Sequence, residues 1–147
     1  MKIAAVSSGG GHWIELLRLL PAFDGHEVTL ITVSDAYREQ AGALRFLTVN
    51  DATRWNKLAL LVQFARLCSI LLRLRPQVVV TTGAAPGYFA LRIGRWLGAR
   101  TVWVDSIANA EELSGAGRRA GRHADLWLTQ WEHLAQPGGP RFEGAVL

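Results

Sequence analysis

Short apolar runs alternate with longer amphipathic segments along the chain. The apolar runs predict strands, and they lie at residues 2–7, 26–33, 45–49, 77–82, 100–104 and 126–129. Apolar residues at helical spacing predict helices over 12–20, 57–74 and 86–97. Because the strands show little polar alternation and are separated by helices, we expect a parallel sheet covered on both faces. The pattern predicts one doubly wound, Rossmann-like α/β domain over residues 1–135 and a turn-rich tail over 136–147.

Three loops follow predicted strands and fall on the edge of the sheet where ligands collect in such folds. They read "SSGGGHW" (7–13), "TTGAAPG" (81–87) and "DSIAN" (105–109). Small and polar residues in all three predict a binding edge. The candidate ligand contacts are Ser8, Gly9, Gly10, Gly11, Gly83, Ala84, Gly87 and Ser106.

The glycine loop before the first helix has three interpretations: a nucleotide cofactor loop, another kind of phosphate loop, or a tight turn. Gly9 and Gly11 fit a dinucleotide motif, and Asp35 lies near the position of a ribose-binding carboxylate. However, Ile14 replaces the third glycine and is expected to push the helix away from the strand. A Walker loop is excluded, because no Gly-Lys-Ser/Thr occurs. In a loop of free N–H groups that holds a phosphate, His12 either donates to the phosphate, acts as a base, or only caps the loop.

The composition limits the partners. The 147 residues carry a formal charge of +4, with a pI near 10, which indicates an anionic partner. No helix-turn-helix, zinc spacing or aromatic-basic strand motif supports nucleic acid, whereas anionic lipid head groups and sugar nucleotides fit. The single cysteine, Cys68, excludes an internal disulfide and a multi-cysteine metal site. Since no signal peptide is visible before the first strand, we expect a cytoplasmic setting.

"SSGGGHW", "TTGAAPG" and "VDSIANAEELSGAGRRAGRHADLWLTQWE" occur in this order over residues 1 to 135. Together they resemble the bacterial polysaccharide-biosynthesis relatives of the Alg-fourteen protein, the membrane-side subunit of a two-part N-acetylglucosaminyltransferase. The sequence departs from this family at Asp105, where we expect Glu, at Asn109, where we expect Arg, and in lacking the membrane anchor of the eukaryotic members.

The resemblance implies the N-terminal half of a glycosyltransferase B fold, with a separate donor-side subunit that holds the UDP-sugar. This half would contact a polyprenyl-diphosphate-linked acceptor, in exopolysaccharide or capsule assembly at the cytoplasmic face of the inner membrane. His12 would be the catalytic base or a phosphate donor, and Asp105 a rival base. No cofactor, metal or nucleic acid is expected. The alternatives are a non-catalytic membrane scaffold that recruits the catalytic partner and a small dinucleotide-binding protein.

Residues 57–74 form an unusually apolar predicted helix, interrupted by Gln63 and Arg66, which makes a poor transmembrane span. It is expected either to be buried between the sheet and neighbouring helices, or to lie on the bilayer with Arg66 and Arg73 at the head groups. The arginine run at 118–122 is either a solvated helix face or a second head-group contact. The chain's end is either a frayed terminus or docks on the partner through Trp131, Leu134, Phe142, Val146 and Leu147.

Overall fold

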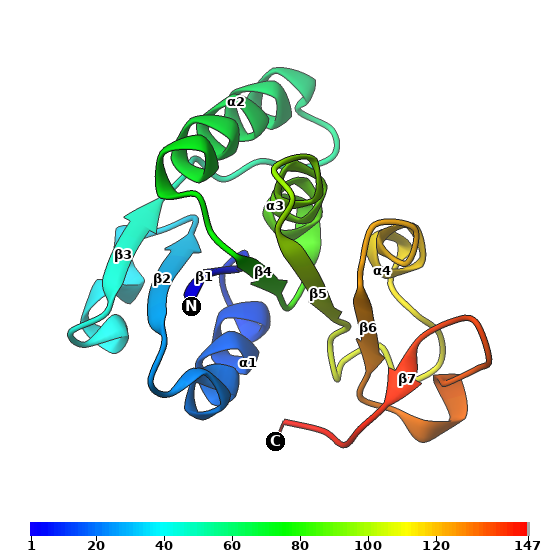
Figure 1. Cartoon of the computed structure of the whole chain (residues 1–147). Helices are drawn as coiled ribbons and strands as arrows, with labels where there is room; N and C mark the ends of the chain where they lie inside the picture. The colour runs from blue at the N-terminus through cyan, green and yellow to red at the C-terminus, as the bar shows by residue number, and fades with distance from the viewer. Residues whose placement is uncertain (147) are drawn as a thin grey trace.

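The computed structural model describes residues 1–146. Over this range seven parallel strands form one sheet in the order β3-β2-β1-β4-β5-β6-β7 (Figure 1). The strands are β1 (Lys2–Val6), β2 (Glu27–Thr32), β3 (Arg45–Thr48), β4 (Val78–Thr81), β5 (Arg100–Val104), β6 (Leu126–Thr129) and β7 (Arg141–Phe142). The helices are α1 (Gly11–Leu19), α2 (Lys57–Leu74), α3 (Ala84–Trp96) and α4 (Gly115–Ala120), with 3₁₀ turns η1 (Leu20–Phe23), η2 (Asp35–Ala41) and η3 (Glu132–Leu134). The predicted doubly wound α/β fold is confirmed.

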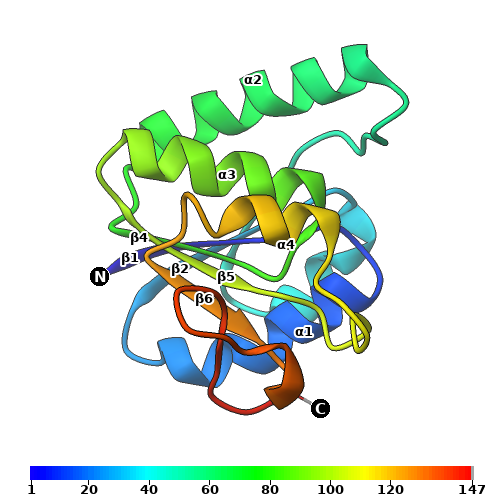
Figure 2. The same ribbon diagram turned by 90° about the vertical axis from the view of Figure 1, so that its right-hand side faces the viewer.

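Helices cover both faces of the sheet. Figure 2 shows α2, α3 and α4 on one side and α1 on the other. β1 contributes side chains to the core on both faces of the sheet, because successive strand residues point to opposite faces. Ala4 and Val6 pack in the core beneath α2 and α3, whereas Ile3 and Ala5 pack with Trp13 of α1. This burial on both faces explains why the strands read as continuous apolar runs.

The tail folds back onto the domain. Residues 141–142 form β7, which pairs with the end of β6, and the Val146 N–H donates to Gln130 Oε1 at 2.8 Å. The strand was not predicted, because it has two residues and lies in a segment rich in proline and glycine. The described part of the tail is therefore ordered against its own chain, while Leu147 lies outside the described residues.

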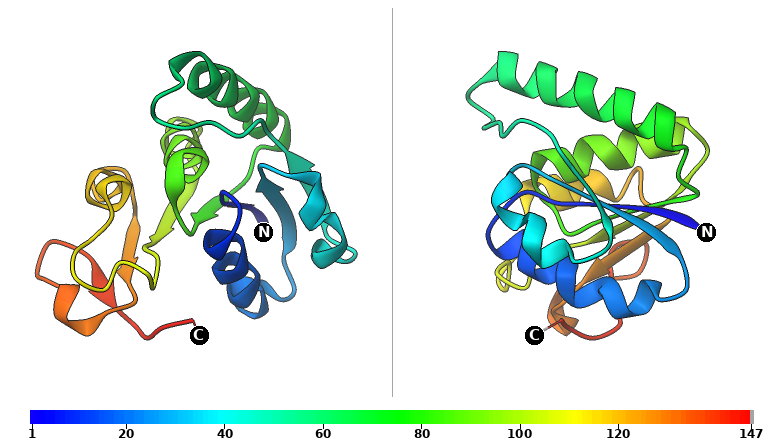
Figure 3. Two further views of the ribbon diagram at one scale, coloured as in Figure 1. Left: turned by 180° about the vertical axis from the view of Figure 1, so that it is seen from behind. Right: turned by 90° about the vertical axis from the view of Figure 1, so that its left-hand side faces the viewer.

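α2 lies on the outside of the helical layer and packs along α3 (Figure 3). Asn56 caps its start by accepting from the Ala59 N–H at 3.0 Å, and Arg75 ends it at φ 48°, just before Pro76. Within residues 1–146 no helix combines the length and apolar character needed to cross a membrane.

The apolar character of α2 is only partly explained by burial. One face packs inward through Gln63, Leu67, Leu71 and Leu74. The opposite face leaves Leu58, Leu61 and Leu72 exposed to 71%, 64% and 49%, and Trp55 just before the helix to 80%. The expectation that α2 is enclosed between the sheet and other helices is wrong for this face, because no other element of the described chain covers it.

Candidate functional site

The strand order reverses between β1 and β4, and this point is where open α/β sheets bind ligands. The loops after β1 and β4 leave the sheet side by side at this reversal, and the loop after β5 follows next along the same edge. The structure therefore brings the three predicted loops to one edge, and α1 begins there at Gly11.

His12 joins the first two loops. Its Nδ1 lies 2.9 Å from the Thr82 carbonyl oxygen, and the Thr82 hydroxyl donates back to the His12 carbonyl at 2.6 Å. Because a carbonyl oxygen only accepts, Nδ1 carries the proton in this contact. In the neutral ring Nε2 then has the free lone pair, which is the arrangement of a positioned base or acceptor. A Cβ at Gly83 would lie 2.9 Å from His12 Cε1, so glycine there makes room for the ring.

The glycine loop offers backbone N–H groups at its helix start. The first helical hydrogen bond of α1 runs from the Ile14 N–H to the Gly10 carbonyl at 3.2 Å. The N–H groups of Gly11, His12 and Trp13 precede that bond and have no partner within the helix. Gly10, at φ 66°, donates its own N–H to the Tyr37 hydroxyl at 2.9 Å. The loop thus presents donors at the positive end of a helix, where anions bind.

Glu15, which the sequence analysis did not single out, holds the third loop. It is 3% exposed. Its Oε1 accepts from the Ile107 N–H at 2.7 Å, from Gln130 Nε2 at 3.0 Å and from the Ser106 hydroxyl at 3.4 Å. Glu15 lies three residues after His12, so both point from one face of α1 towards the neighbouring loops. The three-residue spacing from His12 was the feature of the sequence from which Glu15 could have been predicted. The predicted ligand contact Ser106 is instead occupied by this carboxylate.

Asp105 is enclosed by its own loop. It is 2% exposed, and both carboxylate oxygens accept hydrogen bonds. The donors are Trp103 Nε1 at 3.0 Å, Asn109 Nδ2 at 3.4 Å, and the hydroxyl and N–H of Ser114 at 2.7 and 3.1 Å. This geometry favours a structural role in ordering residues 105–114. The role of Asp105 as a base stays a prediction without support from the geometry.

Other predicted residues have packing roles. Gly87 is buried, and a Cβ there would lie 2.0 Å from Thr81 Oγ1, so this glycine lets α3 approach β4. Its role as a ligand contact stays a prediction. Ile14 is 50% exposed and points away from the sheet, so the expectation that it pushes α1 outward is wrong. Asp35 is exposed and pairs with Arg38 at 3.1 Å.

The remaining predicted ligand contacts lie in or next to the loops after β1 and β4, which His12 connects. Gly9 lies against Tyr37, since a Cβ there would be 2.8 Å from the tyrosine hydroxyl. Ala84 begins α3 at φ 65°, a conformation that is unusual for alanine and often found at functional sites. Ser8 is half-buried beside the glycines, and its carbonyl accepts from the Ser7 hydroxyl at 2.9 Å. Ser8 and Gly9 thus belong to the loop after β1, and Ala84 follows the loop after β4.

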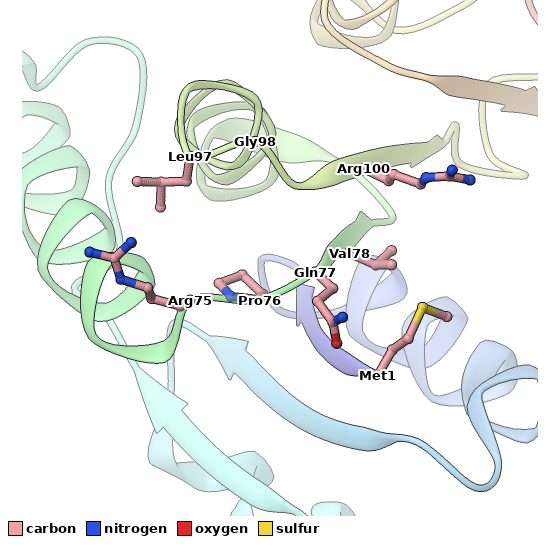
Figure 4. Close-up of a pocket in the computed structure, with 8 residues that line it drawn as sticks. All are labelled: Met1, Arg75, Pro76, Gln77, Val78, Leu97, Gly98 and Arg100. Carbon is pink, nitrogen blue, oxygen red and sulfur yellow. The ribbon is translucent and has the colours of Figure 1, made fainter.

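A hollow of about 640 Å³ lies at the opposite edge of the sheet (Figure 4). It is formed by Met1, by residues 75–78 before and at the start of β4, by Leu97 and Gly98 before β5, and by Arg100 at the start of β5. These residues stand at the amino ends of the strands, away from the reversal-point loops. We therefore place the candidate site at the carboxyl edge and not in this hollow.

No protein-family model and no curated protein matches this sequence, but solved structures share its fold. MurG from Acinetobacter baumannii superposes with a TM-score of 0.78 at 12% identity, over 100% of this chain and 46% of MurG. A UDP-GlcNAc 2-epimerase from Methanocaldococcus jannaschii gives 0.66 at 14% identity, over 88% of this chain and 39% of the epimerase. A glycosyltransferase from Rickettsia africae gives 0.56 at 16% identity, over 82% and 33%.

The chain thus spans less than half the length of these proteins, and at such identities the likeness concerns the fold alone. The domain has the Rossmann-like α/β fold of glycosyltransferase B-fold proteins such as MurG.

Proposed function

We propose that this protein is the acceptor-side subunit of a two-part glycosyltransferase. The enzyme moves a sugar from a UDP-sugar to a polyprenyl-diphosphate-linked saccharide in exopolysaccharide or capsule assembly. The fold shared with MurG and with a glycosyltransferase supports a role in glycosyl transfer. The structure superposes on 46% of MurG, and we propose that a separate donor-side subunit holds the UDP-sugar.

The observation that carries the proposal is the pairing of the glycine loop with an oriented histidine. The N–H groups of Gly11 and His12 bind a phosphate oxygen of the acceptor, and the positive end of α1 stabilises its charge. The His12 Nε2, freed by the bond between Nδ1 and the Thr82 carbonyl, then faces the acceptor. There it takes the proton of the attacking hydroxyl as that oxygen forms its bond to the sugar and the UDP leaves.

The exposed face of α2 gives this subunit a surface for the membrane. Leu58, Leu61 and Leu72 form an apolar stripe, and Arg66 and Arg73, both exposed, run beside it. An amphipathic helix of this kind lies in the interface with apolar side chains in the acyl region and arginines at the head groups. We propose that α2 holds the protein peripherally on the cytoplasmic face of the inner membrane, where the acceptor resides.

Reconstitution tests the proposal. The isolated chain should bind a short-chain polyprenyl-diphosphate saccharide, bind UDP-sugars poorly and transfer no sugar. Co-expression with a donor-side subunit should restore transfer from radiolabelled UDP-sugar. Robust turnover by the chain alone would contradict the split enzyme, and no binding of the acceptor would contradict the acceptor-side role. An unchanged transfer rate in the His12→Ala complex would favour the scaffold alternative, in which the partner supplies all the chemistry.

A further inference from the structure

Four arginine side chains gather in a hollow between α3 and α4, away from the glycine loop. The hollow has a volume of about 500 Å³ and is lined by Tyr88, Arg92, Arg118, Arg119, Arg122 and His123. Tyr88 and Arg92 lie one turn apart on α3, and the others come from α4 and the turn after it. α3 and α4 lie side by side on one face of the sheet (Figures 1 and 2). We call this hollow the arginine pocket.

The positive charge of the arginine pocket is largely unbalanced. Among residues 1–146 no acidic side chain lines it. In the described chain the ion pairs join Arg38 to Asp35, Arg118 to Glu112 and Arg141 to Glu143. Arg118 is thus paired at 3.4 Å on the surface, whereas Arg92, Arg119 and Arg122 have no carboxylate within 4.0 Å among residues 1–146. Like charges that line one hollow repel one another, and a bound anion relieves this repulsion.

Arg92 supplies a separate sign of a missing acceptor. Its guanidinium lies over the ring of Trp96, 5.4 Å from the ring centroid, so its orientation is set by stacking. Its Nε is buried and has no hydrogen-bond acceptor among the described residues. A buried donor without an acceptor is costly, and native structures seldom leave one unpaired. The Arg92 guanidinium thus lines the pocket in an orientation set by Trp96, beside Arg119 and Arg122, which have no ion pair among residues 1–146.

The electrostatic environment of His123 is consistent with an excess of positive charge in the arginine pocket. The pKa of His123 is lowered, first by burial and then by the nearby positive charges of Arg92, Arg95 and Arg122. The histidine ring lies edge-on to Tyr88, with the centroids 6.1 Å apart. The pocket thus disfavours a further positive charge and favours a negative one.

We propose that the arginine pocket binds a phosphate group, through Arg92, Arg119 and Arg122, with the Tyr88 hydroxyl at its edge. Guanidinium groups present paired N–H donors that match phosphate oxygens, which makes arginine the side chain suited to such a ligand. The site is separate from the glycine loop: Ala84, at the loop, and Arg92 are eight residues apart on α3, or about 12 Å along the helix axis. The phosphate belongs either to a lipid head group or to a soluble phosphate compound.

Calorimetry with inorganic pyrophosphate and flotation with phosphatidylcholine vesicles, with and without phosphatidic acid, test the site. The double variant Arg119→Gln, Arg122→Gln removes two exposed guanidinium groups without touching the core. A matched control, Arg45→Gln, Arg100→Gln, removes the same charge from two exposed residues at the starts of β3 and β5. We expect the first variant to bind at least about 10-fold more weakly than wild type, because each lost contact is a charge-assisted hydrogen bond, and the control less than about 2-fold.

The probes separate the two phosphate sources. Loss of pyrophosphate binding in the pocket variant supports a soluble phosphate ligand, and loss confined to phosphatidic acid vesicles supports a lipid head group. The variant Arg119→Lys, Arg122→Lys keeps the charge and should bind more weakly than wild type, because a lysine lacks the paired donors. In a Gly11→Ala background, which removes the proposed glycine-loop contact, the pocket variant should still lower pyrophosphate binding by the same factor. Equal losses in the pocket variant and in the Arg45, Arg100 control would overturn the proposal, because binding would then follow net charge alone.

Discussion

Replacing Gly11 by alanine separates the ligand-binding role of the glycine loop from its role in folding. Gly11 is the first residue of α1, its φ is not in the left-handed region, and a Cβ there meets no atom within 4 Å. Gly10 is unsuitable for the same test, because its φ of 66° would strain any side chain. In the free protein, Gly11→Ala therefore adds a methyl group to open space.

Gly11→Ala should be more stable than the wild-type protein and should bind the acceptor more weakly. Alanine is favoured over glycine in a helix interior by up to about 1 kcal/mol. At a first position we expect about half of this, which raises Tm by about 1–2 °C for a chain of this size. If the Gly11 N–H contacts the acceptor phosphate, the methyl group displaces it. Losing a hydrogen bond to a charged group costs about 1.5–3 kcal/mol, or about 10- to 150-fold in affinity.

Gly115→Ala is the matched control. Gly115 is also the first residue of a helix, α4, and a Cβ there also meets nothing within 4 Å. Affinity of the isolated chain for a short-chain polyprenyl-diphosphate saccharide is measured by calorimetry, and Tm by differential scanning. Wild-type affinity in a stable Gly11→Ala protein would refute the reasoning, since "SSGGGHW" would then be only a tight turn.

Three further predictions concern other parts of the structure. His12→Ala should lower the transfer rate of the two-subunit complex by about 100-fold or more if Nε2 is the base, whereas a higher acceptor KM at an unchanged kcat would identify a phosphate donor. Arg66→Glu with Arg73→Glu should reduce binding to anionic liposomes, and more steeply at low salt; binding equal to wild type would show that α2 does not meet head groups. The pKa of His123 is lowered from 6.5 in the folded state, so the unfolded chain takes up the proton first and stability should fall as the pH drops below about 6.5. His123→Gln should flatten this part of a plot of Tm against pH, and an unchanged slope would contradict the role of His123.

Local pattern was sufficient for most of the fold. Apolar runs and helical spacing placed six strands and three helices, because a parallel sheet buried on both faces leaves that pattern in the chain. Ser114 shows what was missed: it caps α4 by accepting from the Gly117 N–H at 2.8 Å, but the six-residue helix has too few apolar positions to show a period. β7 was not predicted for a similar reason, since a strand of two residues is too short to show an alternation of apolar and polar positions.

The candidate site depended more on tertiary structure. The glycines and His12 were visible in the sequence, because the loop after the first strand has a recognisable composition. Which nitrogen of His12 is free was decided by the Thr82 carbonyl, 70 residues away. Asp105 could not be recognised as enclosed until Trp103 and Ser114 were placed around it.

By itself the sequence determined the strands, the helices and the edge at which the loops gather, because these follow from periodicity and from the parallel connection of strands. Only the tertiary structure decided which face of α2 is exposed, that Glu15 holds the loop after β5, and that Arg92 joins Arg119 and Arg122 in one pocket. The reason is physical: exposure, hydrogen bonding and electrostatic fields depend on distances between residues far apart in the chain, and no local pattern contains those distances.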